Sequence, residues 1–178
     1  MSELVLHRAK SLVGWMSDAE LVILAEFARE SKSVFEIGCY FGRSTRALAD
    51  NCKGKVHAID SWEVINRAND GNPAFDSNII TYNLFRCNLN DHIASGKLIV
   101  NPVNWEDYQS NYTADFIFLD GDHKYEAVKH DILKAFDYLE PNGILSGHDY
   151  NWPGVAKAVN EIFPVINVKE SIWWIRKS

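Results

Sequence analysis

An apolar strand that runs directly into a glycine-containing turn is the feature that most restricts what this chain can fold into. Residues 33–38 predict the strand, residues 43–52 predict a helix, and Gly38 and Gly42 flank the turn between them. Because glycine has no Cβ, the backbone can leave the strand sharply at Gly38, and a ligand or the next helix can approach Gly42 closely. A strand, turn and helix of this kind predict a nucleotide-binding site in an α/β protein.

The spacing of the turn argues against a dinucleotide ligand. Dinucleotide-binding turns have the spacing G-x-G-x-x-G, which places a pyrophosphate against backbone amides at the helix N-terminus. In this chain the spacing is E-x-G-x-x-x-G, beginning with Glu36 at the end of the strand. A carboxylate would repel a pyrophosphate, whereas it suits a ligand that carries a cationic amino group.

Length and composition predict one domain over residues 1–178. Of the 178 residues, 47% are hydrophobic, which is enough for a large core. The net charge is −6 and no basic run is present in the sequence, so we do not expect nucleic acid as a partner. The sequence has no basic and apolar leader pattern and no apolar run long enough to span a bilayer, so we expect a cytoplasmic protein that does not bind a membrane.

Helical and strand patterns alternate along the chain, which predicts an α/β fold. The predicted strands are residues 33–38, 55–60, 97–100, 115–120, 144–149, 165–168 and 172–175, and the predicted helices are residues 18–31, 43–52, 76–94, 125–138 and 154–163. The last two strands are joined by so short a connection that they must pair as an antiparallel hairpin. We therefore expect a Rossmann-like, seven-stranded, mostly parallel sheet with helices on both faces and an antiparallel C-terminal hairpin.

Three further segments complete this outline. Residues 1–31 predict an N-terminal helical segment, and residues 61–80 are a turn-rich insertion that we expect to border the site. Pro141–Gly143 predicts a turn that leads into the fifth strand.

Four segments at successive predicted strand ends carry a resemblance to a known family. They are Glu36–Thr45, Ala58–Trp62, Phe118–Glu126 and Pro141–Tyr150. With the predicted fold, they resemble class I S-adenosylmethionine-dependent methyltransferases, and are most similar to small-molecule O-methyltransferases of the catechol O-methyltransferase-like and macrocin-type group. The resemblance implies S-adenosyl-L-methionine as the cofactor and methyl transfer to a small hydroxylated acceptor, such as a sugar or a phenol. Two alternatives stay open: a non-catalytic module with this fold, and a nucleotide-dependent oxidoreductase on a related scaffold.

The ends of the first two strands predict the cofactor contacts. Asp60 ends the second strand and is placed to accept hydrogen bonds from two ribose hydroxyls, although it could instead cap a loop. The resemblance places Glu36 near the amino group of the methionine portion, although Glu36 could instead cap the helix. The other predicted contacts here are Gly38, Cys39, Gly42, Ser44 and Ser61.

Adenine requires a flat apolar slot and a polar contact at its edge. Trp62, and the pair Asn104 and Trp105 after the third strand, are candidates, although a tryptophan in such a protein could equally fill the core. On the acceptor side, Trp152 is one of several aromatic residues that could line a pocket. Because the chain is short for this group of enzymes, a homodimer could supply a further wall.

Acidic residues and histidines cluster at the ends of the fourth and fifth strands: Asp120, Asp122, His123, His148 and Asp149. In one interpretation, Asp120 and Asp149 bind Mg²⁺ or a similar divalent cation, which holds the acceptor hydroxyl and lowers its pKa. Tyr150 stands where metal-dependent relatives have Asn or Asp, so Asp122 or Asn151 would supply the third ligand. Asp120 is also placed to contact the cofactor.

A second interpretation needs no metal. His123 or His148 removes the proton from the acceptor hydroxyl, because an imidazole has a pKa near the working pH. We prefer His123 as this base. Methyl transfer is then an in-line displacement, for which the protein supplies alignment and deprotonation.

Overall fold

A sheet with the strand order β3-β2-β1-β4-β5-β7-β6 organises the structure, which is a computed structural model that describes residues 3–62 and 78–178. The strands are β1 (Ser33–Ile37), β2 (Lys55–Asp60), β3 (Leu98–Pro102), β4 (Ala114–Leu119), β5 (Leu139–Gly147), β6 (Asn167–Lys169) and β7 (Ile172–Arg176). The helices are α1 (His7–Ser11), α2 (Asp18–Glu30), α3 (Arg43–Asn51), α4 (Asn78–Asn88), α5 (Asn90–Ala94), α6 (Tyr125–Tyr138) and α7 (Pro153–Ile162), with a short 3-10 helix, η1 (Trp105–Asp107).

The sheet is parallel from β1 to β5 and ends in an antiparallel pair, as the sequence predicts. β1 lies between β2 and β4, and all three strands run in the same direction. The strand order therefore reverses between β1 and β4, which is where ligands bind in open parallel sheets. β7 pairs antiparallel with both β5 and β6, and the left-handed backbone of Glu170 (φ 54°) lies in the tight turn that joins β6 to β7.

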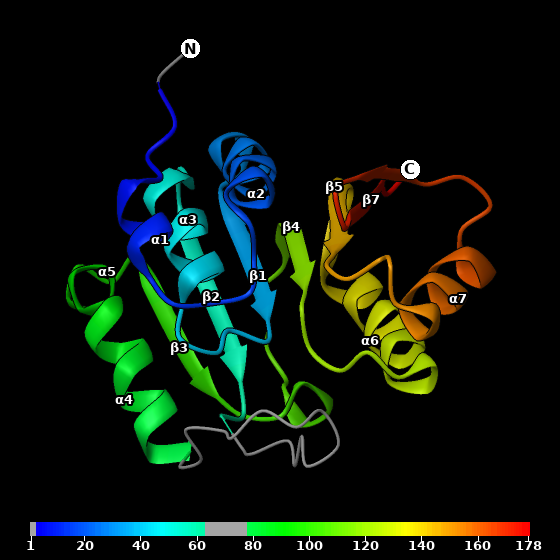
Figure 1. Cartoon of the computed structure of the whole chain (residues 1–178). Coiled ribbons are helices and arrows are strands. Elements are labelled where there is room, and N and C mark those ends of the chain that lie inside the picture. Colours follow the sequence, from blue (N-terminus) through cyan, green and yellow to red (C-terminus); the bar gives the residue numbers. More distant parts are fainter. Residues whose placement is uncertain (1–2, 63–77) are drawn as a thin grey trace.

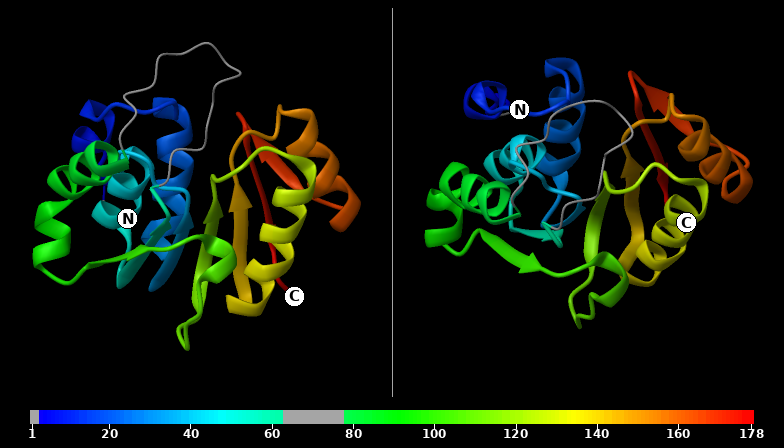
Figure 2. Two further views of the ribbon diagram at one scale, coloured as in Figure 1. Left: turned by 90° about the horizontal axis from the view of Figure 1, so that it is seen from below. Right: turned by 60° about the horizontal axis from the view of Figure 1, so that its bottom comes forward.

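Helices cover both faces of the sheet. Helices α1 to α5 lie on one side and α6 and α7 on the other (Figures 1 and 2). Because successive side chains of a strand point to opposite faces, Phe116 and Phe118 of β4 pack in the core with α2 and α3, whereas Ile117 and Leu119 pack in the core with α6 and α7. None of the described helices is long and apolar enough to cross a membrane.

The structure differs from the predicted elements at two places. The helix predicted over residues 76–94 is two helices, α4 and α5, which meet at Leu89, where the buried leucine side chain packs toward the glycine turn. The turn predicted at Pro141–Gly143 is a bulge inside β5, where Asn142 has a left-handed backbone (φ 63°) and the pairing with β4 passes from Leu139 to Ile144. The amide of Asn142 donates to the carbonyl of Lys177, which keeps this segment in the sheet. Residues 63–77 of the predicted insertion lie outside the described residues.

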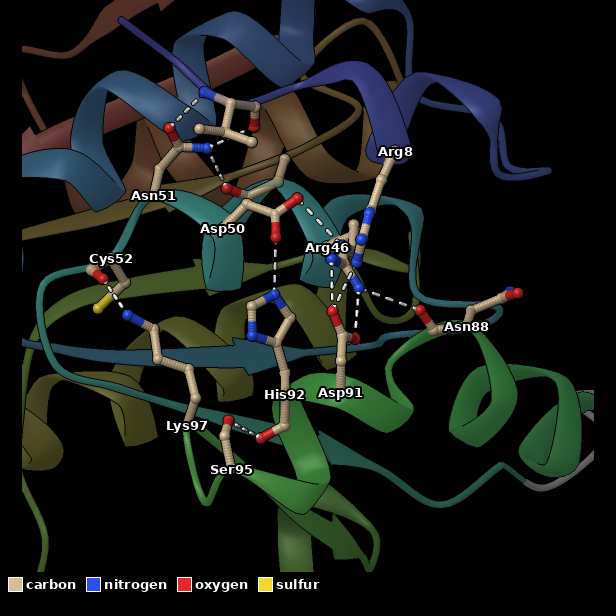
Figure 3. A network of polar contacts seen from close by, with 12 residues as sticks. Arg8, Arg46, Asp50, Asn51, Cys52, Asn88, Asp91, His92, Ser95 and Lys97 are labelled. Carbon is tan, nitrogen blue, oxygen red and sulfur yellow. Dashed lines mark hydrogen bonds and ion pairs between the residues drawn. The ribbon is translucent and has the colours of Figure 1, made fainter. Parts of the chain in front are cut away.

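A buried arginine joins α3 to α5 (Figure 3). The Nη1 and Nη2 atoms of Arg46 donate to the two carboxylate oxygens of Asp91 at 2.6 and 2.9 Å, and its Nε donates to Asp50 at 3.0 Å. Only 5% of the Arg46 side chain and 7% of the Asp50 side chain are exposed. On the outer side of the same network, Arg8 of α1 donates to Asp91 at 2.7 Å. The network fixes α5 beside the helix that follows the glycine turn.

We predict that the two arginines of this network contribute very differently to stability. Arg46→Ala should lower the free energy of unfolding by about 3 to 5 kcal/mol, because the buried carboxylate of Asp50 loses its guanidinium and keeps only His92 as a partner among the described residues. Arg8→Ala, the matched control, should lower it by less than about 1 kcal/mol, because the Arg8 side chain is 57% exposed and its ion pair is screened by water. Urea denaturation of both variants measures the difference, and equal losses would contradict this account.

Candidate active site

Three backbone hydrogen bonds join the strand ends that carry the predicted site. They run from the amide of Gly38 to the carbonyl of Ile59 (3.0 Å), from Asp120 to Ile37 (2.8 Å), and from His148 to Leu119 (3.0 Å). The residues that follow β1, β2, β4 and β5 are therefore held side by side at one edge of the sheet. This edge contains the predicted cofactor turn and the predicted catalytic cluster.

Both glycines of the turn are required by their surroundings. Gly38 has a left-handed backbone (φ 85°), and a Cβ added there would lie 2.1 Å from the carbonyl oxygen of Asp120. Gly42 is also left-handed (φ 88°), and a Cβ there would lie 2.3 Å from the side chain of Leu89. The sequence analysis expected a ligand or the next helix to approach Gly42, and among the described residues the side chain that approaches it most closely is that of Leu89, between α4 and α5.

The carboxylate of Asp60 fastens the glycine turn. Its Oδ2 accepts hydrogen bonds from the amides of Cys39 (2.7 Å) and Tyr40 (3.0 Å), and its Oδ1 accepts one from the amide of Trp62 (2.6 Å). These bonds support the left-handed backbone of Tyr40, whose φ is 47°. A carboxylate has about four acceptor positions, so one position remains for a ribose hydroxyl. The capping role is a finding, and the ribose contact stays a prediction.

Glu36 is completely buried at the end of β1. None of its surface is exposed, and neither carboxyl oxygen forms a hydrogen bond with another described residue. Burial raises the pKa of Glu36 to about 8, although the nearby hydroxyls of Ser44 and Thr45 act in the opposite direction. The nearby carboxylate of Asp120 raises this pKa further. The folded chain therefore holds Glu36 as the neutral acid at pH 7, and a cationic group of a ligand would favour its ionised form.

Cys39, Ser44 and Ser61, the other predicted cofactor contacts near the turn, are buried or half-buried. Burial raises the pKa of the Cys39 thiol well above its usual value, so Cys39 is a neutral side chain that packs and is not an activated nucleophile. Ser44 is buried at the start of α3, and Ser61 is half-buried beside Asp60. Their contacts with a cofactor stay predictions.

The two tryptophans predicted to contact adenine have different surroundings. Trp62 packs in a core, on the face of the sheet covered by α4, where its ring lies 4.8 Å from that of Phe85 and its Nε1 donates to the carbonyl of Tyr40 at 3.0 Å. Trp105 packs in the core with α6, where its ring contacts those of Tyr108 and Tyr138. Both positions agree with the alternative that a tryptophan here fills the core. The turn of η1 directs the Trp105 ring inward, whereas Asn104 is exposed at the start of the turn.

The predicted catalytic residues form one chain of contacts. Nε2 of His123 lies 2.6 Å from Oδ2 of Asp149. Nδ1 of His148 lies 3.2 Å from the same oxygen and 3.4 Å from Oδ1 of Asp120. Burial lowers the pKa of His148, but the hydrogen bonds and charges of Asp120 and Asp149 outweigh it and raise the pKa to about 11. Burial acts against the charge of Asp149 as well, yet His123 and His148 hold its pKa below the usual range.

Glu20 is a member of this cluster that the sequence analysis did not identify. Its Oε1 lies 3.2 Å from Nε2 of His148 and accepts a hydrogen bond from the hydroxyl of Ser171. Its Oε2 accepts from the amide of Ser17, which completes a capping box at the start of α2. The spacing of Ser17 and Glu20 indicates the capping box, but the contact with His148 depends on tertiary packing and leaves no signal in the sequence.

Among the described histidines, cysteines and acidic residues, the candidate metal ligands are Asp120, Asp149 and His123, which takes the place of the predicted Asp122. One ligand atom from each of these three residues lies within 4.8 Å of the other two. Asp122 is outside this group, and its Oδ1 accepts a hydrogen bond from the amide of Lys124 at 3.0 Å. The other predicted third ligand, Asn151, stays a prediction. Two carboxylates and an imidazole fit Mg²⁺ poorly, because Mg²⁺ prefers oxygen ligands. A cation is also not needed to balance the two carboxylates, because His148 lies beside both of them.

Comparison with solved structures identifies the same fold in known methyltransferases. An O-methyltransferase from Bacillus cereus in complex with SAH aligns with a TM-score of 0.66 at 14% identity, over 95% of this chain and 86% of that chain. The O-methyltransferase TomG from Streptomyces achromogenes, involved in tomaymycin synthesis and in complex with SAM, aligns with a TM-score of 0.64 at 15% identity, over 97% and 86% of the two chains. The N-methyltransferase NodS from Bradyrhizobium japonicum aligns with a TM-score of 0.59 at 15% identity, over 89% and 93%.

The sequence itself also matches a family. A search of curated proteins gave no match. The family model described as a methyltransferase domain, however, matches residues 35–150, which contain the glycine turn, Asp60, Asp120, His123 and Asp149. Since this match covers well over half of the chain and the fold agrees with it, the chain belongs to the methyltransferase domain family.

Proposed function

We propose that this chain is an S-adenosylmethionine-dependent O-methyltransferase in which His123 is the general base. The observation that carries the proposal is the hydrogen bond of 2.6 Å between His123 and Asp149, which lies at the sheet edge shared with the glycine turn. The names of O-methyltransferases with the same fold, two of which were crystallised with SAH or SAM, support the choice of cofactor and of oxygen as the methylated atom.

The residues of the cofactor side fit this cofactor. Glu36 is a buried acid whose oxygens lack partners among the described residues, and a cationic amino group would supply one. Gly38 lets the end of β1 meet the backbone of Asp120, and Asp60 has one acceptor position that a ribose hydroxyl could use. When bound, S-adenosylmethionine supplies a methyl group on a sulfonium, which an oxygen nucleophile attacks in line.

The catalytic cluster can deprotonate that oxygen nucleophile. Asp149 is ionised and accepts a hydrogen bond from Nε2 of His123, so the lone pair of the imidazole is on Nδ1. Nδ1 takes the proton of the acceptor hydroxyl, and Asp149 stabilises the imidazolium that results. His148, held between Asp149, Asp120 and Glu20, keeps the Asp149 carboxylate oriented.

The charges around the cluster restrict the acceptor. Asp120, Asp149 and Glu20 surround a single imidazolium, so an anionic acceptor would be repelled. We therefore infer a small neutral hydroxylated acceptor, a phenol or a sugar. A second copy of the chain could close the acceptor side of the site.

We predict that cofactor binding and turnover separate between two aspartates. Asp60→Ala should weaken S-adenosylmethionine binding about a hundredfold, because it removes charged hydrogen bonds to both the ribose and the turn. Asp149→Ala should leave the affinity nearly unchanged and lower turnover about 10²- to 10⁴-fold, because it removes the partner of the base. Calorimetry with S-adenosylmethionine, and S-adenosylhomocysteine formation with a panel of phenols and sugars, measure the two effects. The reverse pattern would overturn the site assignment, and an absence of any heat from the wild type would overturn the proposed function.

We predict that Glu36 makes stability fall with rising pH. Its pKa in the folded chain, about 8, is above the usual value of 4.5, so its contribution is complete below pH 4.5 and is lost as the pH rises through 8. Wild-type stability should therefore lose about 1.4 kcal/mol per pH unit relative to Glu36→Gln over this window, as an upper limit. Urea denaturation at a series of pH values measures the difference. Glu26→Gln, at an exposed glutamate, should keep the wild-type slope, and equal slopes in all three proteins would contradict the neutral state of Glu36.

We predict that metal removal does not abolish turnover. EDTA should leave S-adenosylhomocysteine formation unchanged, because His123 and His148 already serve the roles of a base and a balancing cation. His123→Ala should lower turnover about 10²- to 10⁴-fold, because it removes the base. If EDTA abolishes turnover and a divalent cation restores it, Asp120, His123 and Asp149 act as metal ligands and the base assignment is wrong.

A further inference from the structure

The indole of Trp152 stacks on the imidazole of His123. The two ring centroids are 4.7 Å apart, and the ring planes differ by 24°. Trp152 is 51% exposed, and it belongs to neither of the two hydrophobic cores formed by the described residues. The described aromatic ring that Trp152 contacts is therefore that of His123, the proposed base.

The backbone around Trp152 is fixed by the same turn that presents Asp149. The amide of Trp152 donates to the carbonyl of Asp149 at 2.8 Å, and Pro153, which has a restricted φ, begins α7. Gly154 then packs against the His123 segment so closely that an added Cβ would lie 2.3 Å from the carbonyl oxygen of His123. The stack thus arises from a rigid junction between two loops.

A base on a partly exposed loop requires more than one restraint. The hydrogen bond to Asp149 fixes the position of Nε2, but by itself it allows the imidazole plane to turn about that bond. The stacked indole restricts this rotation, because a tilted ring would lose contact area or collide with the indole. With both restraints, the direction of the free Nδ1 atom is defined.

We propose that Trp152 is a positioning residue, which holds the imidazole of His123 in the plane that presents Nδ1 to the acceptor hydroxyl. This inference rests on the proposed function, in which His123 is the base. Trp152 acts through His123 and does not itself exchange a proton. Alignment of this kind has a large effect on rate, since a small displacement of a reacting group is costly.

Nuclear magnetic resonance at one fixed pH tests the proposal without an acceptor. The His123 ring signals are assigned by their absence from His123→Asn. In the wild type we expect ring protons shifted upfield by the indole and nitrogen signals of a single tautomer protonated at Nε2. Trp152→Leu should abolish the upfield shift and produce averaged tautomer signals, whereas Trp152→Phe should keep a single tautomer.

The chain offers a matched control in a second pair of an exposed aromatic ring and a histidine. Tyr112 is 62% exposed, and its ring centroid lies 5.0 Å from that of His57. Tyr112→Leu should shift the signals of His57 and leave those of His123 unchanged. If Trp152→Leu leaves the tautomer signals of His123 as in the wild type, Trp152 is not a positioning residue.

Kinetics then separate positioning from a structural role. With an acceptor that the wild type methylates, Trp152→Leu should lower kcat about tenfold or more while the affinity for S-adenosylmethionine stays the same, and Trp152→Phe should restore most of the loss. A lower melting temperature with an unchanged kcat would overturn the proposal. A wild type that methylates no acceptor would count against the proposed function, while the resonance signals of His123 would still decide the role of Trp152.

Discussion

The close approach of Gly38 to the backbone of Asp120 is the contact on which both halves of the site depend. A side chain at position 38 would collide with the carbonyl oxygen of Asp120 at 2.1 Å, so only glycine allows the ends of β1 and β4 to meet. The turn after β1 supplies the predicted cofactor contacts, and the loop after β4 supplies Asp120 and His123. A larger residue at position 38 would therefore separate the predicted cofactor turn from the proposed base.

Charge balance joins distant parts of the chain around this contact. His148 is surrounded by carboxylates from α2, β4 and β5, and the hydroxyl of Ser171 in the turn of the C-terminal hairpin bonds to Glu20. A buried carboxylate is tolerated when a cation and hydrogen bonds compensate its charge. If one partner is lost, the remaining charged groups stay buried without compensation, and their desolvation destabilises the folded state. The helix α2, which covers one face of the sheet, and the C-terminal hairpin, which forms one edge of it, thus also take part in the site. The family match, over residues 35–150, therefore does not include Glu20 and Ser171, which help to hold the cluster together.

Most of the fold is predictable because it follows from local patterns. The helix over residues 125–138 and the strand over residues 55–60 have the predicted bounds, since their apolar periodicity is unambiguous. The division of the predicted helix at Leu89 was not predicted, because it depends on packing against Gly42. The inclusion of Asn142 in β5 was missed for a similar reason: its partner is Lys177, which is distant in the sequence.

The positions of the candidate site residues in the fold were predictable in part, and again because they follow from local patterns. Residues that end strands, such as Asp120 and Asp149, can be located from the sequence because the ends of parallel strands meet at one edge. The contact of Glu20 with His148 and the stack of Trp152 on His123 join side chains from separate elements, and no local pattern records them. The core position of Trp105 likewise depends on which way a short turn points its ring.

Glu36 shows how a cofactor site can oppose the stability of its own fold. A buried acid without hydrogen-bond partners among the described residues departs from the rule that buried polar groups are satisfied, and such departures concentrate at functional sites. A glutamate with the usual pKa of 4.5 is ionised near neutral pH, whereas Glu36 stays protonated in the folded chain. This difference lowers the stability of the folded state. A cationic group bound beside it reverses the sign of this effect, because the ionised carboxylate then has a partner. The residue that weakens the ligand-free fold is therefore the one that would couple its stability most directly to the cofactor.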